Sequence, residues 1–142
     1  MSLGGASTLL AGENLKADAL VLEAVYGDIE TAASNRLRRY LGGIGPYFTP
    51  FLVRTIEFWL AMSRDDLRPA EAAKNNHVAK LIIAGSADVL ATPQESRRIF
   101  ENSPEPKASW LVEGAGHQDF YRFAPAEYRK HVLPFLDQYL RK

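Results

Sequence analysis

The sequence contains no cysteine, which excludes disulfide bonds and thiolate metal sites. Charge of either sign is not in excess, because 17 basic and 17 acidic residues give a formal net charge of zero. Nucleic acids and anionic membranes attract proteins with a surplus of Lys and Arg, so we expect neither as a partner. No apolar run approaches the roughly 18 residues of a membrane-spanning helix. No basic start followed by an apolar stretch marks a secretory signal either, and we expect a cytoplasmic location.

Metal-ligand spacing is also missing. The three histidines lie far apart, and no cluster of His, Asp and Glu resembles a metal site, so we expect no metal and no cofactor. Internal repeats and low-complexity segments are absent too. What remains is an ordinary folded composition, with 46% apolar residues in a chain of 142, which is long enough for one domain with a sizeable core.

Three short segments have the composition of buried strands. Residues 18–26 form a nearly continuous apolar run, and residues 78–85 and 108–113 are similar. Such runs are typical of strands covered on both faces, as in a parallel sheet. Helical patterns occupy about 3–13, 29–41, 50–62, 93–102 and 125–140. Strands that alternate with helices in this way predict an α/β fold with a parallel sheet.

A mostly helical insertion over about 28–76 separates the first two predicted strands. Its charged residues are expected to face solvent; they include Arg36, Arg38 and Arg64. Its aromatic residues are expected to pack in the core or within the insertion, with an apolar substrate pocket as the alternative; they include Tyr47, Phe48, Phe51, Phe58 and Trp59. His77 and His131, which lie outside the insertion, are interpreted as surface or packing residues.

Ser2 opens the string Ser2-Leu3-Gly4-Gly5-Ala6-Ser7. Small residues after a serine allow a strand and a helix to meet at a sharp turn, from which the hydroxyl projects. The pattern by itself is weak, and an accidental match or a vector-derived start is the alternative.

Asp88 and His117 each follow a predicted strand, in the strings Gly85-Ser86-Ala87-Asp88 and Gly114-Ala115-Gly116-His117. Parallel sheets place their active sites at the carboxyl ends of the strands. A carboxylate there can orient an imidazole, and the imidazole can accept the proton of a serine hydroxyl. Taken singly, the aspartate is as compatible with a turn and the histidine with a surface loop.

Taken together, the order Ser…Asp…His resembles that of the α/β-hydrolases, over essentially the whole chain. The sequence is most similar to serine aminopeptidase-like and esterase-like members with a small helical cap. The resemblance implies a partial α/β-hydrolase fold over 1–142, with three parallel strands, flanking helices and a cap over about 28–76.

The same resemblance implies roles for individual residues. Ser2 would be the nucleophile, His117 the general base and Asp88 the residue that orients it, with the backbone N–H of Leu3 as an oxyanion donor. The implied reaction is hydrolysis of a small ester or amide through an acyl-enzyme. One alternative is a non-catalytic, truncated remnant. Another is an unrelated small α/β binding domain with chance matches.

The sequence lacks the N-terminal half of that family, including the strand before the serine and the second oxyanion donor. Loss of one oxyanion donor commonly lowers the rate on the order of a hundredfold or more, so we expect weak or no activity from the isolated chain. The 18–26 strand would then have an open apolar edge. Open edges pair with other chains, and we expect a homodimer through this one.

Overall fold

A parallel three-stranded sheet forms the centre of the structure, a computed structural model that describes residues 2–12 and 15–140. The strands lie in the order β1-β2-β3 and comprise Ala19–Glu23, Ala79–Gly85 and Lys107–Val112. In the register, Ala19 lies opposite Ala79, and Lys80 lies opposite Lys107. The predicted parallel α/β sheet is therefore confirmed.

The first strand is shorter than the predicted 18–26. It ends at Glu23 because Ala24 has a φ of 47°, which extended backbone does not allow. Residues 24–26 are nevertheless buried, with Val25 at 1% exposure. These three residues are apolar because they form a buried turn, and not because they belong to the strand. The sequence pattern therefore predicts a strand that is too long.

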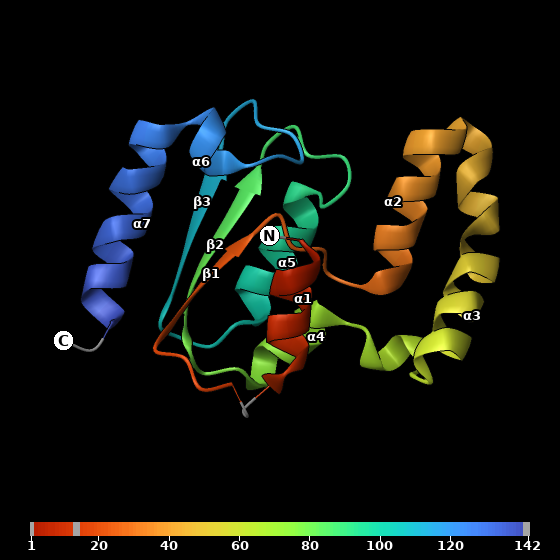
Figure 1. Ribbon diagram of the computed structural model, residues 1–142, viewed down its shortest axis with the longest axis horizontal. Coiled ribbons are helices and arrows are strands. Elements are labelled where there is room, and N and C mark those ends of the chain that lie inside the picture. Colours follow the sequence, from red (N-terminus) through yellow and green to blue (C-terminus); the bar gives the residue numbers. More distant parts are fainter. Residues whose placement is uncertain (1, 13–14, 141–142) are drawn as a thin grey trace.

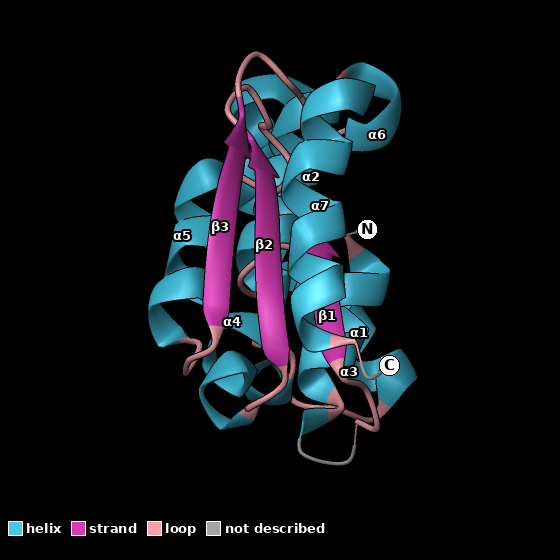
Figure 2. Cartoon of the chain, turned by 90° about the vertical axis from the view of Figure 1, so that its left-hand side faces the viewer, coloured by secondary structure: helices cyan, strands magenta, loops and turns pink. Residues whose placement is uncertain are grey.

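The helices cover both faces of the sheet. The α-helices are α1 (Leu3–Leu10), α2 (Ile29–Leu41), α3 (Thr49–Leu60), α4 (Pro69–Ala72), α5 (Pro93–Asn102), α6 (Phe120–Phe123) and α7 (Pro125–Tyr139). Short 3₁₀ helices are η2 (Gly42–Phe48), η3 (Arg64–Asp66) and η4 (Ala73–Asn75). Figures 1 and 2 show α7 on one face and α1, α4 and α5 on the other. Among the described residues, no helix is both long and apolar enough to cross a bilayer.

The second and third helices form a hairpin that extends away from the sheet (Figure 1). The expectation that its aromatic residues pack in the core is wrong, because Tyr47 is 84% exposed, Phe58 is 82% exposed, and Phe48, Phe51 and Trp59 are exposed as well. Only a narrow face of the hairpin is buried, around Ala32, Ala33 and Val53. Helical periodicity reveals an apolar face but does not reveal what covers it.

Candidate active site

Ser2 lies at the carboxyl end of β1, immediately before α1. Its backbone N–H donates a 2.8 Å hydrogen bond to the carbonyl oxygen of Glu23, the last residue of the strand. The backbone of Ser2 has φ 48° and ψ −106°. A conformation of this kind costs a non-glycine residue on the order of 1–3 kcal/mol and is found mainly at functional sites. The serine is thus held in a strained turn like that of a nucleophile elbow.

Gly5 allows α1 to pack closely on the segment that follows β1. A Cβ atom at this position would fall 2.3 Å from Cγ2 of Val25, whereas a Cβ at Gly4 would meet nothing within 4 Å. The close approach fixes the start of α1 against the end of β1. Of the two glycines after Ser2, Gly5 is therefore the one that permits this close approach.

Asp88 and His117 form a hydrogen-bonded pair. The carboxylate of Asp88 is completely buried, and its Oδ2 lies 2.7 Å from Nδ1 of His117. The other oxygen, Oδ1, accepts the backbone N–H groups of Leu90 at 2.8 Å and Ala91 at 2.9 Å. With both oxygens occupied, the carboxylate is held in one orientation and in turn orients the imidazole.

The loops that carry this pair are bound directly to each other. The backbone N–H of Ala87 donates to the carbonyl of Ala115 at 2.9 Å. A Cβ atom at Gly85 would fall 2.3 Å from the same carbonyl oxygen, so only glycine permits this approach. The pairing of Asp88 with His117 is therefore built on contacts between the ends of β2 and β3.

Ser2 is not hydrogen-bonded to His117. Within residues 2–12 and 15–140, Ser2 Oγ has one hydrogen-bond partner, Nη2 of Arg36 at 3.5 Å, and His117 Nε2 has none. Bonds of this kind are often loose before a substrate is bound. Leu3 is the first residue of α1, where a backbone N–H has no acceptor within the helix and the helix dipole favours negative charge.

Arg36 is the functional candidate that the sequence interpretation misses. It was expected to face solvent, but the structure places it half-buried beside Ser2. A signal existed in the helical spacing: Arg36 lies four residues after Ala32 and three after Ala33, both of which are buried. Residues with that spacing share one face of a helix, so Arg36 belongs to the inward face.

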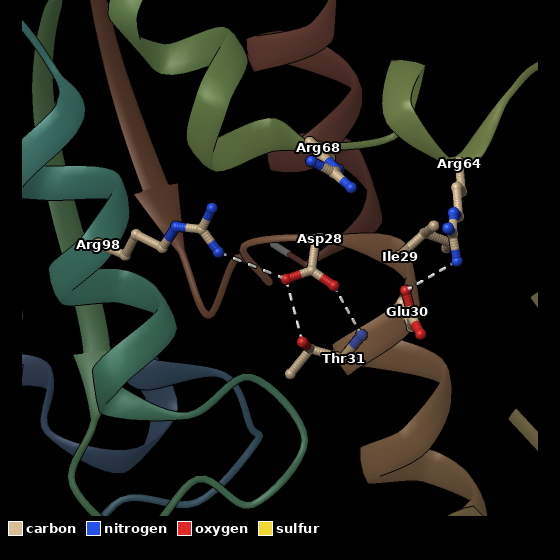
Figure 3. A pocket seen from close by; sticks show the side chains of 7 residues that line it. All are labelled: Asp28, Ile29, Glu30, Thr31, Arg64, Arg68 and Arg98. Carbon is tan, nitrogen blue, oxygen red and sulfur yellow. Dashed lines mark hydrogen bonds and ion pairs between the residues drawn. The ribbon is translucent and has the colours of Figure 1, made fainter.

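A separate pocket lies where the α2–α3 hairpin joins the rest of the molecule (Figure 3). Most of its charged side chains are paired with one another: Asp28 caps α2 through Thr31 and lies 3.7 Å from Arg98, and Arg64 lies 3.6 Å from Glu30. Arg68 pairs instead with Asp65, outside the pocket lining. None of Ser2, Asp88 and His117 lines it. The described residues also contain no group of three or more His, Asp or Glu side chains that could hold a metal ion.

Solved structures of several hydrolases share this architecture. No protein-family profile and no curated protein matches the sequence. An esterase from Pyrococcus furiosus superposes with a TM-score of 0.70 at 14% identity, over 99% of this chain and 51% of its own. An acetyl xylan esterase from Paenibacillus sp. R4 gives 0.67 at 16% identity, over 98% of this chain and 43% of its own.

A puromycin-hydrolysing peptidase from Mycobacterium tuberculosis gives a TM-score of 0.68 at 23% identity, over 98% of this chain and 21% of its own. The chain thus spans about half the length of the first esterase and less of the other two proteins. Similarity at these identities concerns the fold, because one fold hosts many activities. This chain has the α/β-hydrolase fold, over the part of that fold that it spans.

Proposed function

We propose that this protein is a serine hydrolase that cleaves a small ester or amide through an acyl-enzyme. The observation that carries the proposal is the bond between the buried carboxylate of Asp88 and Nδ1 of His117. This pair and the strained turn of Ser2 all lie at the carboxyl ends of the parallel strands. The similar structures of two esterases and a peptidase support a hydrolase-type function. Ser2 is the nucleophile, His117 the general base and Asp88 the residue that orients it.

The reaction follows from these positions. Ser2 Oγ attacks the carbonyl carbon of the substrate while His117 Nε2 takes the hydroxyl proton. The backbone N–H of Leu3 stabilises the oxyanion, and the carboxylate of Asp88 stabilises the protonated imidazole. The intermediate then expels an alcohol or amine, which takes the proton from His117. Water cleaves the acyl-enzyme in the same way, with His117 again as the base.

We expect the activity of this chain to be weak. Ser2 Oγ and His117 are not hydrogen-bonded, and Leu3 is the one oxyanion donor that we assign. An oxyanion hole normally combines two donors, and removing one lowers kcat by about 10²–10³-fold. The nucleophile can therefore react with a strong electrophile much more readily than with an ordinary ester.

A fluorophosphonate probe tests the nucleophile directly. We expect covalent labelling of the wild-type chain and none of Ser2→Ala, because phosphonylation requires an activated serine. Ser7→Ala is the matched control, since Ser7 is an exposed serine in α1, the helix that follows Ser2, and should leave labelling unchanged. Equal labelling of the wild type and Ser2→Ala, or no labelling of folded protein, would remove Ser2 as the nucleophile.

A second function is favoured by the open edge of the sheet. Among the described residues, β1 pairs with β2 alone, so its other edge has no partner strand. Unpaired edges recruit strands from other chains. In this alternative the chain is a non-catalytic protein, and two copies join antiparallel through β1 about a two-fold axis.

Size-exclusion chromatography with light scattering separates the two functions when it is combined with the probe. A folded dimer that does not label supports the non-catalytic protein, and labelling supports the hydrolase. A Val21→Pro substitution in β1 should give monomers if the edge is the interface, because proline cannot donate to a strand ladder. A well-folded monomer of the wild type at micromolar concentration would contradict pairing through this edge.

A further inference from the structure

The guanidinium of Arg36 is held beside the hydroxyl of Ser2. Its Nη2 lies 3.5 Å from Ser2 Oγ, and its Nη1 donates a 3.1 Å hydrogen bond to the carbonyl of Ala32, one turn earlier in α2. Its central carbon lies 6.0 Å from the centre of the Tyr26 ring, at the outer range of a cation–π contact. Three separate contacts therefore fix this cation at the candidate nucleophile.

No acidic side chain neutralises Arg36. Among residues 2–12 and 15–140, no carboxylate lies within ion-pair distance of its guanidinium, whereas Arg64, Arg68 and Arg98 each have at least one. Tyr26 does not supply a negative charge either, because burial raises the pKa of its hydroxyl, against the opposing effect of Arg36. A half-buried cation without a counter-charge attracts an anion to its side.

The free donors of Arg36 suit a planar anion. A guanidinium has five N–H donors, of which the hydrogen bonds to Ala32 and Ser2 use two. The rest can bind the two oxygens of a carboxylate side by side, which is the geometry that arginine favours. A carbonyl carbon attacked by Ser2 Oγ would stand within a few bonds of a carboxylate bound there.

We propose that Arg36 is a specificity-determining residue that binds a carboxylate of the substrate close to the scissile bond. The preferred substrates are then esters or amides that carry a carboxylate a few bonds from the reacting carbonyl. This inference rests on the proposed hydrolase function. The anion site itself is a property of Arg36 and can be measured without turnover.

Two matched pairs of esters measure the preference. For the leaving-group side the pair is 3-acetoxybenzoate and 3-acetoxybenzamide, and for the acyl side it is the phenyl esters of 3-carboxybenzoic and 3-carbamoylbenzoic acid. Each pair differs in charge but hardly in size. The quantity compared is the ratio of kcat/KM for the anionic and the neutral member of each pair.

We expect Arg36→Gln to lower this ratio by about 10- to 100-fold in at least one pair, since hydrogen bonds to charged groups contribute about 1.5–3 kcal/mol. Arg36→Lys should keep part of the preference, because it retains the charge but not the planar pair of donors. Arg39→Gln is the matched control: Arg39 is exposed in the last turn of the same helix, and its loss should leave the ratio unchanged.

Equilibrium binding separates this inference from the proposed function. Titration of ¹⁵N-labelled protein with benzoate should shift the amide signals around Ser2, benzamide should not, and Arg36→Gln should weaken benzoate binding at least tenfold. In one outcome benzoate binding depends on Arg36, but the protein does not react with the fluorophosphonate. That outcome would remove the hydrolase proposal and keep the anion site. The opposite outcome is that the fluorophosphonate labels Ser2, while Arg36→Gln changes neither the kcat/KM ratio of the esters nor the binding of benzoate. That outcome would overturn the anion site and keep the hydrolase.

Discussion

Oδ2 of Asp88 lies 2.7 Å from Nδ1 of His117, although the two residues are 29 positions apart in the sequence. The contact arises because β2 and β3 are parallel neighbours, so the loops that follow them leave the sheet side by side. Burial of the carboxylate and its two backbone hydrogen bonds give the pair one geometry.

Asp88→Asn should slow fluorophosphonate labelling by about 10²–10⁴-fold, because an amide holds the imidazole in the wrong tautomer and does not stabilise its charged form. The labelling rate, measured on folded protein, checks this. Asp119→Asn is the control, since Asp119 is close to His117 in sequence but uses its carboxylate to cap α6. Similar rates for Asp88→Asn and the wild type would mean that the pair has no part in activating Ser2.

Ser2→Gly should increase the free energy of unfolding by up to about 2 kcal/mol, because glycine adopts positive φ without the strain that serine bears there. The gain is reduced by the extra chain entropy of glycine in the unfolded state. Ser2→Ala retains the strain and should not stabilise the protein, although neither variant can be labelled. Urea denaturation of both variants compares them, and equal midpoints would show that the turn is not strained.

Gly5→Ala should destabilise the fold by about 1–3 kcal/mol, as overpacking of a close contact does. The new methyl group would overlap Val25, which is itself buried. Gly4→Ala, at the preceding position of the same helix, adds a methyl group in open space and should stabilise the helix by up to about 1 kcal/mol. Thermal unfolding of the two variants should therefore move the midpoint in opposite directions, and parallel shifts would contradict the close approach of α1.

Lys80 should make the protein more stable as the pH rises from about 8 to 10.5. Its side chain is fully buried and donates to the carbonyls of Asn76 and Val78. Burial, together with the charge of Lys107, lowers the pKa of Lys80 from 10.5 to about 8. Between these values the unfolded chain binds more protons than the folded one, so the free energy of unfolding increases with pH.

Urea denaturation at a series of pH values measures this slope. Lys80→Met should remove the contribution of Lys80 to the rise between pH 8 and 10.5, because methionine does not titrate. Lys130→Met serves as the control, since Lys130 is an exposed lysine on α7 whose loss should leave the slope in place. A wild-type slope in Lys80→Met would assign the effect to other groups.

The strands and the Asp88–His117 pair were accessible from the sequence because both depend on local patterns and on connection order. Continuous apolar runs identify buried parallel strands, and loops after adjacent parallel strands must emerge at one edge. The start of α5 is equally local, because Thr92 and Glu95, three positions apart, form a capping box there. These features need little knowledge of contacts between distant residues.

Tertiary structure decided how the α2–α3 hairpin sits against the remainder of the chain. The side chains of Phe58 and Trp59 proved exposed, and Arg36 proved to face Ser2, although the helices themselves were predicted. Helical periodicity specifies which residues share a face, but the partner of that face depends on contacts between segments far apart in the sequence. For that reason the sequence was enough to identify the order of Ser2, Asp88 and His117, whereas only the tertiary structure identified Arg36 as the cation beside Ser2.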